Sequence, residues 1–239
     1  MIIVERTNIF VSRGGLEMSF LSSSIGRKMI MAATGFMLLG FLLIHLCGNS
    51  LIYVGWINAY GERLHSMPPV VWGFRLFMLA VFMLHIFFGI QLTIENNAAR
   101  PQAYAVKRNL RATFSGRTMI WTGGLIAVFL VYHLLHFTAR LTNPAISSGT
   151  DAMGRLDVFR MVVLSFQNPA IASAYIAAMI ILALHLTHGI QSFIQTFGLN
   201  NNRTIPVVEK AGTGAALIFL LGYAAIPVVI ILGLLNYKG

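Results

Sequence analysis

Cysteine and acidic residues are scarce in this chain of 239 residues. The single cysteine, Cys47, excludes disulfide frameworks, a cysteine-ligated zinc site and an iron–sulfur cluster held by this chain alone. Seven Asp and Glu stand against seventeen Lys and Arg, and charged residues make up only 10% of the chain. A dinucleotide-binding fingerprint is also lacking. Redox or metal chemistry here therefore has to use ligands other than cysteine.

Apolar residues, in contrast, make up 57% of the chain, and the mean hydropathy is +0.76. This composition is typical of an integral membrane protein. Five apolar runs reach the roughly 20 residues that a helix needs to cross a bilayer. They lie near residues 28–53, 70–94, 118–141, 169–197 and 211–235. The sequence predicts an all-α membrane protein with five transmembrane helices. Its basic residues flank these runs, which suits anionic lipid, and no nucleic-acid partner is predicted.

We expect one transmembrane domain, residues 26–239, preceded by a cytoplasmic arm, residues 1–25. No small-residue cleavage site follows the first apolar run, so we expect that run to be retained as a helix. Five crossings place the chain ends on opposite sides, and Lys and Arg divide eleven against six between those sides. This excess predicts a cytoplasmic N-terminus. The long outside segment, residues 143–168, is expected to carry a short helix near 153–164.

Histidine is concentrated in the apolar runs. The chain has seven histidines, and only His65 falls in a predicted loop. An ionisable side chain inside a membrane is costly and indicates function. The other six are His45, His85, His133, His136, His185 and His188.

These histidines follow two internal repeats. LHIFFGIQ at 84–91 and LHLTHGIQ at 184–191 share the pattern L-H-x3-G-I-Q. Residues 34–45 and 122–133 both read Thr-Gly, nine residues, His. The first four helices are therefore predicted to be a duplicated helical hairpin with one patterned histidine in each helix.

Depth in the membrane arranges the four patterned histidines in two level pairs. At about 1.5 Å per residue, His45 and His133 lie roughly 25 Å from the cytoplasmic edge. His85 and His185 lie roughly 15 Å from the same edge. Two imidazoles at one depth on different helices suit a haem b, with one nitrogen on each face of the iron. We therefore predict two haems b, separated by roughly 10 Å along the membrane normal.

Other residues near these histidines are predicted to assist. Gly89 and Gly189 stand one turn beyond His85 and His185, where they would clear space for a porphyrin. Arg75, about ten residues outward of His85, is expected either to pair with a propionate of the outer haem or to reach the interface.

Two further histidines leave the ligand assignment open. His136 and His188 lie one turn from His133 and His185, and either one is an alternative ligand on its helix. The repeats favour His133 and His185. The simpler role for the other two is a hydrogen bond to a propionate, a carbonyl group or water.

Together the two motif pairs resemble the dihaem cytochrome b subunit of the succinate dehydrogenase and fumarate reductase family, in particular its single-anchor branch with five helices. The stretches NAYGERLHSMP and LTIENNAARPQAY are similar to that branch as well. The resemblance implies that His85 and His185 hold an inner haem and that His45 and His133 hold an outer haem.

The resemblance also implies a bacterial inner membrane, partners and a substrate. A flavoprotein with FAD and an iron–sulfur subunit would carry out the succinate or fumarate chemistry, and two such heterotrimers would associate. This chain would pass electrons between the iron–sulfur subunit and a quinone, expected to be menaquinone. A quinone would bind near the outer haem, where the candidate residues are Asn49, Glu62, His65, Arg75 and His136. Some fumarate reductases of this family carry a Glu where Ala183 stands here, so we do not expect a proton route through that position.

Two other functions stay open at this point. A dihaem b subunit of a hydrogenase or a formate dehydrogenase would also place histidine pairs in a short bundle. A proton-coupled transporter without haem would be indicated by broken helices or carboxylates at the midplane. The spans contain no predicted carboxylate, and their only internal proline is Pro227.

Overall fold

The computed structural model describes residues 23–99 and 113–237, and in these ranges the chain is almost entirely helical, without strands. The long helices are α2 (Ser24–Ser50), α4 (Pro68–Ala98), α6 (Met119–His133), α9 (Pro169–Thr196) and α10 (Ile205–Ile231). The short ones are η1 (Leu51–Val54), α3 (Ile57–His65), α5 (Phe114–Arg117), η2 (Leu134–Thr138), α7 (Pro144–Ser147) and α8 (Val158–Phe166). The predicted all-α class is confirmed.

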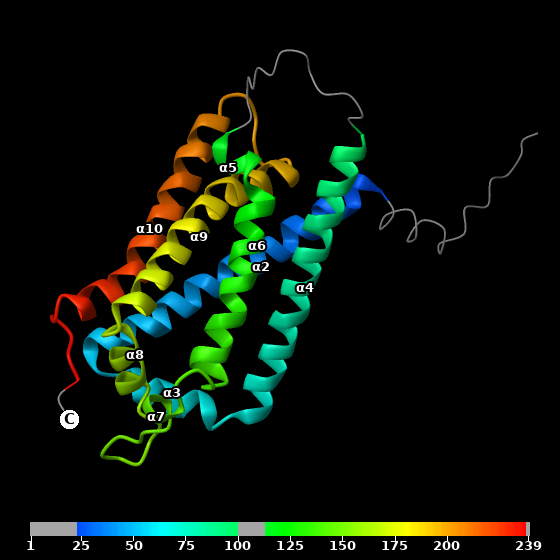
Figure 1. Cartoon of the computed structure of the whole chain (residues 1–239). Helices are drawn as coiled ribbons and strands as arrows, with labels where there is room; N and C mark the ends of the chain where they lie inside the picture. Colours follow the sequence, from blue (N-terminus) through cyan, green and yellow to red (C-terminus); the bar gives the residue numbers. More distant parts are fainter. Residues whose placement is uncertain (1–22, 100–112, 238–239) are drawn as a thin grey trace, which may run out of the picture.

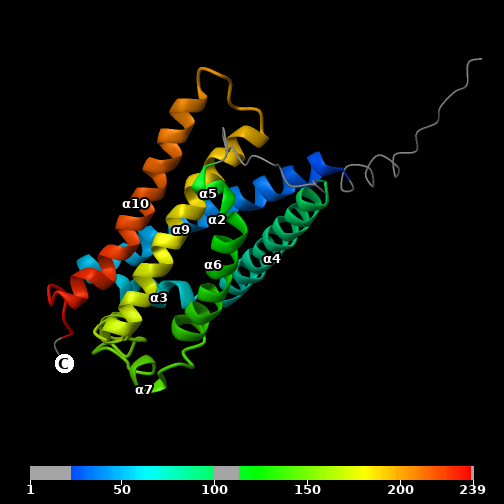
Figure 2. The ribbon, with the colours of Figure 1, turned by 45° about the horizontal axis from the view of Figure 1, so that its top comes forward.

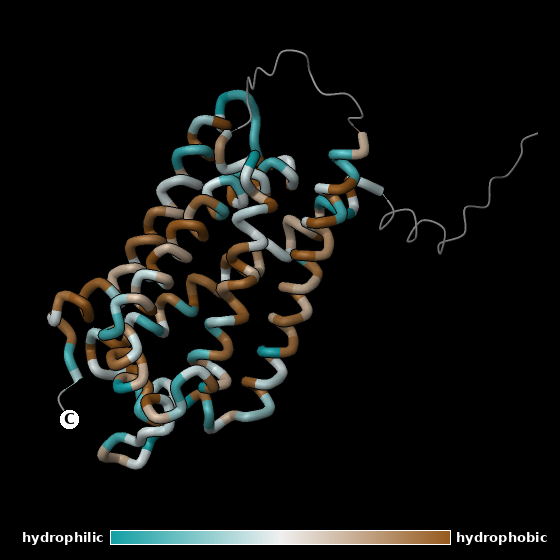
Figure 3. Tube along the Cα trace, viewed as in Figure 1, coloured by the Kyte–Doolittle hydropathy of each residue, from teal (hydrophilic) through white to brown (hydrophobic). Residues whose placement is uncertain are grey.

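Five of the described segments are long and apolar enough to cross a membrane, as predicted. Their outer faces carry large apolar side chains that a soluble bundle would bury. Val128 in α6 is 71% exposed and Leu221 in α10 is 69% exposed. Figure 3 shows apolar residues along the middle of the bundle and hydrophilic residues at both ends. Exposed apolar faces on hydrogen-bonded helices suit lipid, so the chain is a multi-pass membrane protein.

The bundle consists of two hairpins and an added helix. α2 packs against α4 and α6 against α9, while α10 lies alongside α9 (Figure 1). Figure 2 shows α2 inclined to the other long helices and crossing behind α9. We call the group of α3, α7, α8 and the loop 148–157 the cap, because it gathers at one end of the bundle. The connection between α9 and α10 lies at the opposite end.

Helix α10 is fitted to α2 by a small residue and a hydrogen bond. A Cβ atom on Gly222 would lie only 2.8 Å from Leu46 Cδ2, so a larger residue there would displace Leu46. The neighbouring Tyr223 donates its hydroxyl proton to the Leu42 carbonyl at 2.7 Å. The fifth helix therefore packs closely on the segment of α2 that carries His45.

Some boundaries differ from the predicted ones for identifiable reasons. α10 begins at Ile205, six residues before the predicted start, because Pro206 suits a first helical turn. It ends before Gly233, whose φ of 70° is left-handed. The predicted outside helix begins at Val158, where the Asp157 side chain caps it. α2 begins at Ser24, within the predicted arm, and residues 1–22 lie outside the described residues.

Candidate functional site

The four patterned histidines meet in the two predicted pairs. The ring centres of His85 and His185 are 6.3 Å apart, with 69° between the ring planes. Those of His45 and His133 are 5.9 Å apart, with 87° between the planes. Each pair takes one ring from the α2/α4 hairpin and one from the α6/α9 hairpin. The second pair lies nearer the cap.

These separations can be compared with a metal held between two imidazoles. A nitrogen–metal bond of about 2 Å on each side, plus roughly 1 Å from nitrogen to ring centre, gives ring centres about 6 Å apart. Both pairs match this value. Ordinary aromatic packing covers the same range, at about 4.5–7 Å, so the nitrogen atoms have to be considered as well.

In the His85–His185 pair, a threonine of the preceding long helix holds each ring at Nδ1. The Thr34 hydroxyl oxygen lies 3.2 Å from His85 Nδ1. The Thr122 hydroxyl oxygen lies 3.1 Å from His185 Nδ1. A ligand histidine commonly uses one nitrogen for such a second contact and the other for the metal. This pair therefore fits a bis-histidine haem.

The glycine after each threonine leaves space for the histidine ring. A Cβ atom on Gly35 would lie 3.2 Å from His85 Cε1, and a Cβ atom on Gly123 would lie 3.3 Å from His185 Cε1. These distances are tighter than usual contacts, so a side chain at either position would press on the ring. The Thr-Gly half of the repeat thus serves the histidine of the next long helix.

The distance between the pairs follows from this contact. Thr34 touches His85 and precedes His45 by eleven residues, which is about 16 Å along α2. The predicted separation was roughly 10 Å, measured along the membrane normal. The inclination of α2 in Figure 1 accounts for part of the difference.

The His45–His133 pair has less uniform surroundings. His133 Nδ1 lies 3.4 Å from the Tyr175 hydroxyl, which leaves Nε2 for a metal. His45 Nε2, however, lies 3.3 Å from the Asn49 side-chain nitrogen. Binding a metal through that nitrogen requires Asn49 to turn away. The fit of this pair to a haem is weaker than that of His85 and His185.

His136 has a different environment from its neighbour His133. It is only 1% exposed, and its Nδ1 lies 3.0 Å from the Tyr175 hydroxyl. Its Nε2 lies 3.1 Å from the Ser165 hydroxyl in α8. It belongs to η2, a π-helical turn in which Ala139 N donates to the Leu134 carbonyl. Both ring nitrogens of His136 have hydrogen-bond partners, which indicates a structural role for this side chain. His133 is the ring that faces His45.

His188, the other alternative ligand, packs against α5 instead of facing His85. A Cβ atom on Gly116 would lie 3.0 Å from both Cε1 and Nδ1 of the His188 ring. The two glycines one turn beyond the patterned histidines are open. Nothing lies within 4 Å of a Cβ atom on Gly189, and a Cβ atom on Gly89 would meet only the Met31 methyl group, at 3.6 Å.

The remaining predicted residues lie toward the cap. Glu62 and His65 are both exposed and stand three residues apart on α3, one above the other on one face. His65 Nδ1 donates to the Gly61 carbonyl at 2.7 Å, so Nε2 can accept a proton. Arg75 lies in the second turn of α4, where its guanidinium carbon is 5.1 Å from the centre of the Trp72 ring.

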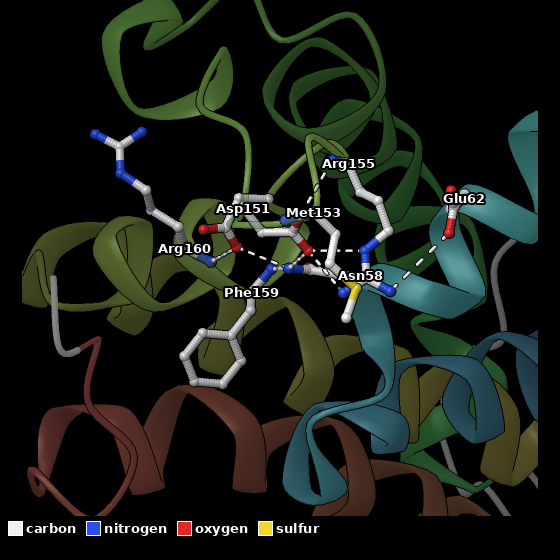
Figure 4. A network of polar contacts seen from close by, with 8 residues as sticks. Asn58, Glu62, Asp151, Met153, Arg155, Phe159 and Arg160 are labelled. Carbon is white, nitrogen blue, oxygen red and sulfur yellow. Dashed lines mark hydrogen bonds and ion pairs between the residues drawn. The ribbon is translucent and has the colours of Figure 1, made fainter.

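A polar network in the cap joins the two hairpins (Figure 4). Buried Asn58 of α3 donates to Asp151 at 3.2 Å and to Asp157 at 3.0 Å, and accepts from the Phe159 amide at 2.8 Å. Arg155 pairs with Asp151 at 2.7 Å and approaches Glu62 at 3.9 Å. The network therefore ties the α3 face that carries Glu62 to the loop before α8.

This network predicts acid sensitivity. The Arg155 guanidinium beside Asp151, with the backbone amides of Arg155 and Met153, lowers the pKa of that carboxyl from 3.8 to about 2. A folded-state pKa below the unfolded one stabilises the protein above pH 3.8, and this contribution is lost as the pH falls toward 2. We expect the melting temperature in detergent to fall between these values. Asp151→Asn should flatten the fall, and equal slopes for both proteins would contradict the prediction.

An apolar pocket of about 240 Å³ opens between α6 and α9. Phe129 and Tyr132 line it, and their rings also contact His133 and His136, at 5.9 and 5.4 Å between ring centres. The pocket therefore lies beside the pair nearer the cap. None of the predicted quinone residues lines it.

The residues that orient the rings are not among the site residues predicted from the sequence. Thr34 and Thr122 mark a repeat in the sequence, and their recurrence at a fixed distance from a histidine is a signal of a shared role. No sequence signal indicated that Tyr175 and Ser165 would meet His136, because they lie on other helices.

Comparisons with protein-family models, with curated proteins and with solved structures find no match to this chain.

Proposed function

We propose that this protein is the membrane-anchor cytochrome b subunit of a succinate dehydrogenase or fumarate reductase. It would carry two haems b and pass electrons between an iron–sulfur subunit and a membrane quinone such as menaquinone. A flavoprotein with FAD would complete the heterotrimer, and heterotrimers would pair. The N-terminus would face the cytoplasm of a bacterial cell.

One observation carries this proposal: four histidines from two hairpins face each other in two pairs at 6.3 and 5.9 Å. A proton-coupled transporter would be indicated by carboxylates at the midplane, and the predicted spans contain none. Within the described residues, no group of three or more His, Cys, Asp or Glu converges on one point, so the histidines come together in twos.

The residues have separate tasks in this proposal. Haem iron supplies one-electron transfer when it is bound. His85 and His185 would hold the inner haem and His45 and His133 the outer one, with Gly89 and Gly189 leaving room for a porphyrin. Arg75 would pair with a propionate of the outer haem or reach the interface.

Quinone chemistry would take place near the cap. Oxidation of a quinol releases two protons, which need an acceptor at the water boundary. Glu62 and His65 share an exposed face of α3 and both can accept a proton there. The apolar pocket beside Phe129 offers a surface for the isoprenoid tail. His136, whose ring nitrogens both have hydrogen-bond partners, would have a structural role at this site.

The first test is a reduced-minus-oxidised spectrum of the purified protein with its haem content measured per chain. We expect two b-type haems, each six-coordinate and low-spin. A colourless protein would contradict the proposal and leave the proton-coupled transporter as the remaining function. Succinate:quinone activity of the complex purified from its native membrane then separates this family from hydrogenase or formate dehydrogenase subunits, which would copurify with other catalytic partners.

A further inference from the structure

The two hairpins hold the rings of His85 and His185 with the same two residues. In each hairpin a threonine of the first helix meets Nδ1 of the histidine in the second helix. In each, the following glycine lies against Cε1 of the same ring. In the described part of the chain, neither contact occurs at His45 or His133, whose polar neighbours are Asn49 and Tyr175. The arrangement is specific to one pair.

The hydroxyl groups of Thr34 and Thr122 each have backbone carbonyls to which they can donate. Thr34 Oγ1 lies 2.8 Å from the Ile30 carbonyl and 3.0 Å from the Met31 carbonyl. Thr122 Oγ1 lies 3.1 Å from the carbonyls of both Thr118 and Met119. A threonine in a helix donates its single proton to such a carbonyl.

It follows that each threonine can only accept a hydrogen bond from its histidine. Nδ1 must then carry the ring proton, and in a neutral imidazole Nε2 is the bare nitrogen. The same contact fixes the rotation of the ring about its axis. Each ring of this pair thus has Nε2 as the nitrogen that is available to bind a metal.

We propose that Thr34 and Thr122 are positioning residues that select the Nδ1–H tautomer of His85 and His185 and so direct Nε2 to the inner haem iron. This inference rests on the proposed function. Gly35 and Gly123 complete the arrangement by leaving each ring its space. Donation of the Nδ1–H proton to the threonine oxygen also makes Nε2 a more basic ligand, which favours the ferric state.

The test compares Thr34→Val and Thr122→Val with the native protein by redox titration and haem retention. We expect the midpoint potential of the inner haem to rise, by about 59 mV for each tenfold loss of preference for ferric iron. Haem retention at that site should fall about 10- to 100-fold. The outer haem should keep its potential. Thr34→Ser and Thr122→Ser retain the hydroxyl and should restore the native values.

Thr187→Val is the matched control. Thr187 stands in α9 near His185, but its hydroxyl donates to the Ala183 carbonyl at 2.8 Å and meets no histidine. This substitution removes the same kind of helix bond, so it should leave both potentials unchanged. A shift of the inner potential equal to that of Thr122→Val would overturn the inference.

A second set of variants tests the glycines and does not depend on the valine proteins folding. Gly123→Ala should disturb the inner haem because the added methyl group meets His185 Cε1. Gly124→Ala adds the same group one residue later, where nothing lies within 4 Å, and should have no effect. Gly35→Ala and Gly40→Ala form the equivalent pair in α2. Equal haem retention within both pairs would contradict the proposed positioning.

Different results would contradict the proposed function and the inference about Thr34 and Thr122. A native protein without haem contradicts the proposed function. A native protein with two haems, whose inner potential is the same with valine or threonine at both positions, contradicts only this inference.

Discussion

His185→Ala is expected to halve the haem content, from two haems b per chain to one. The substitution would remove one of the two histidines proposed to hold the inner haem, and His85 alone would not retain it. The outer haem should keep its spectrum and its potential, because Thr34, which contacts His85, and His45 lie about 16 Å apart along α2. Haem content per chain and the low-spin EPR signals of the oxidised protein measure this outcome.

His188→Ala is the control for that experiment. The His188 ring packs against Gly116 and does not face His85, so its loss should leave both haems in place. The reverse pattern, with the inner haem retained in His185→Ala and lost in His188→Ala, would assign the ligand to His188.

His133→Ala and His136→Ala should have opposite effects on haem and on stability. His133→Ala is expected to remove the outer haem. His136→Ala deletes a buried ring, leaves the Ser165 hydroxyl without its histidine partner and removes one of the two histidines that meet the Tyr175 hydroxyl, which should cost about 2–5 kcal/mol. We expect its melting temperature to fall while the outer haem remains bound at low temperature.

Tyr175→Phe gives this comparison a control. It keeps the aromatic ring and removes the hydroxyl that meets both histidines, at 3.0 Å from His136 and 3.4 Å from His133. A smaller loss of stability than in His136→Ala is expected, with both haems retained. Loss of the outer haem in His136→Ala, with retention in His133→Ala, would show that His136 is the haem ligand and His133 the structural residue.

The sequence was sufficient to predict the parts that depend on long repeated patterns. Five apolar runs predicted the five long helices, and most boundaries agree within a few residues. The histidine repeats and their depth predicted which rings face each other, and the ring centres of these pairs lie 6.3 and 5.9 Å apart. The haems, the quinone and the partner subunits stay predictions.

Contacts between distant segments could not be predicted in this way. The bond of His136 to Ser165 depends on how the short helix α8 folds back against η2. The cap network depends on Asn58 meeting residues about a hundred positions away, such as Asp157. No periodicity in a single sequence encodes such encounters, because each depends on the final packing of several helices.

The pairing of equivalent residues has a geometric consequence. His45 meets His133 and His85 meets His185, so each residue faces its own counterpart from the other hairpin. Such self-matching contacts arise where an approximate twofold rotation axis passes between the partners. Both ring pairs would therefore lie on one axis that runs through the bundle from the cap to its opposite end. Two identical copies of one hairpin, each with a single Thr-Gly step and two histidines, contain everything needed to build both pairs.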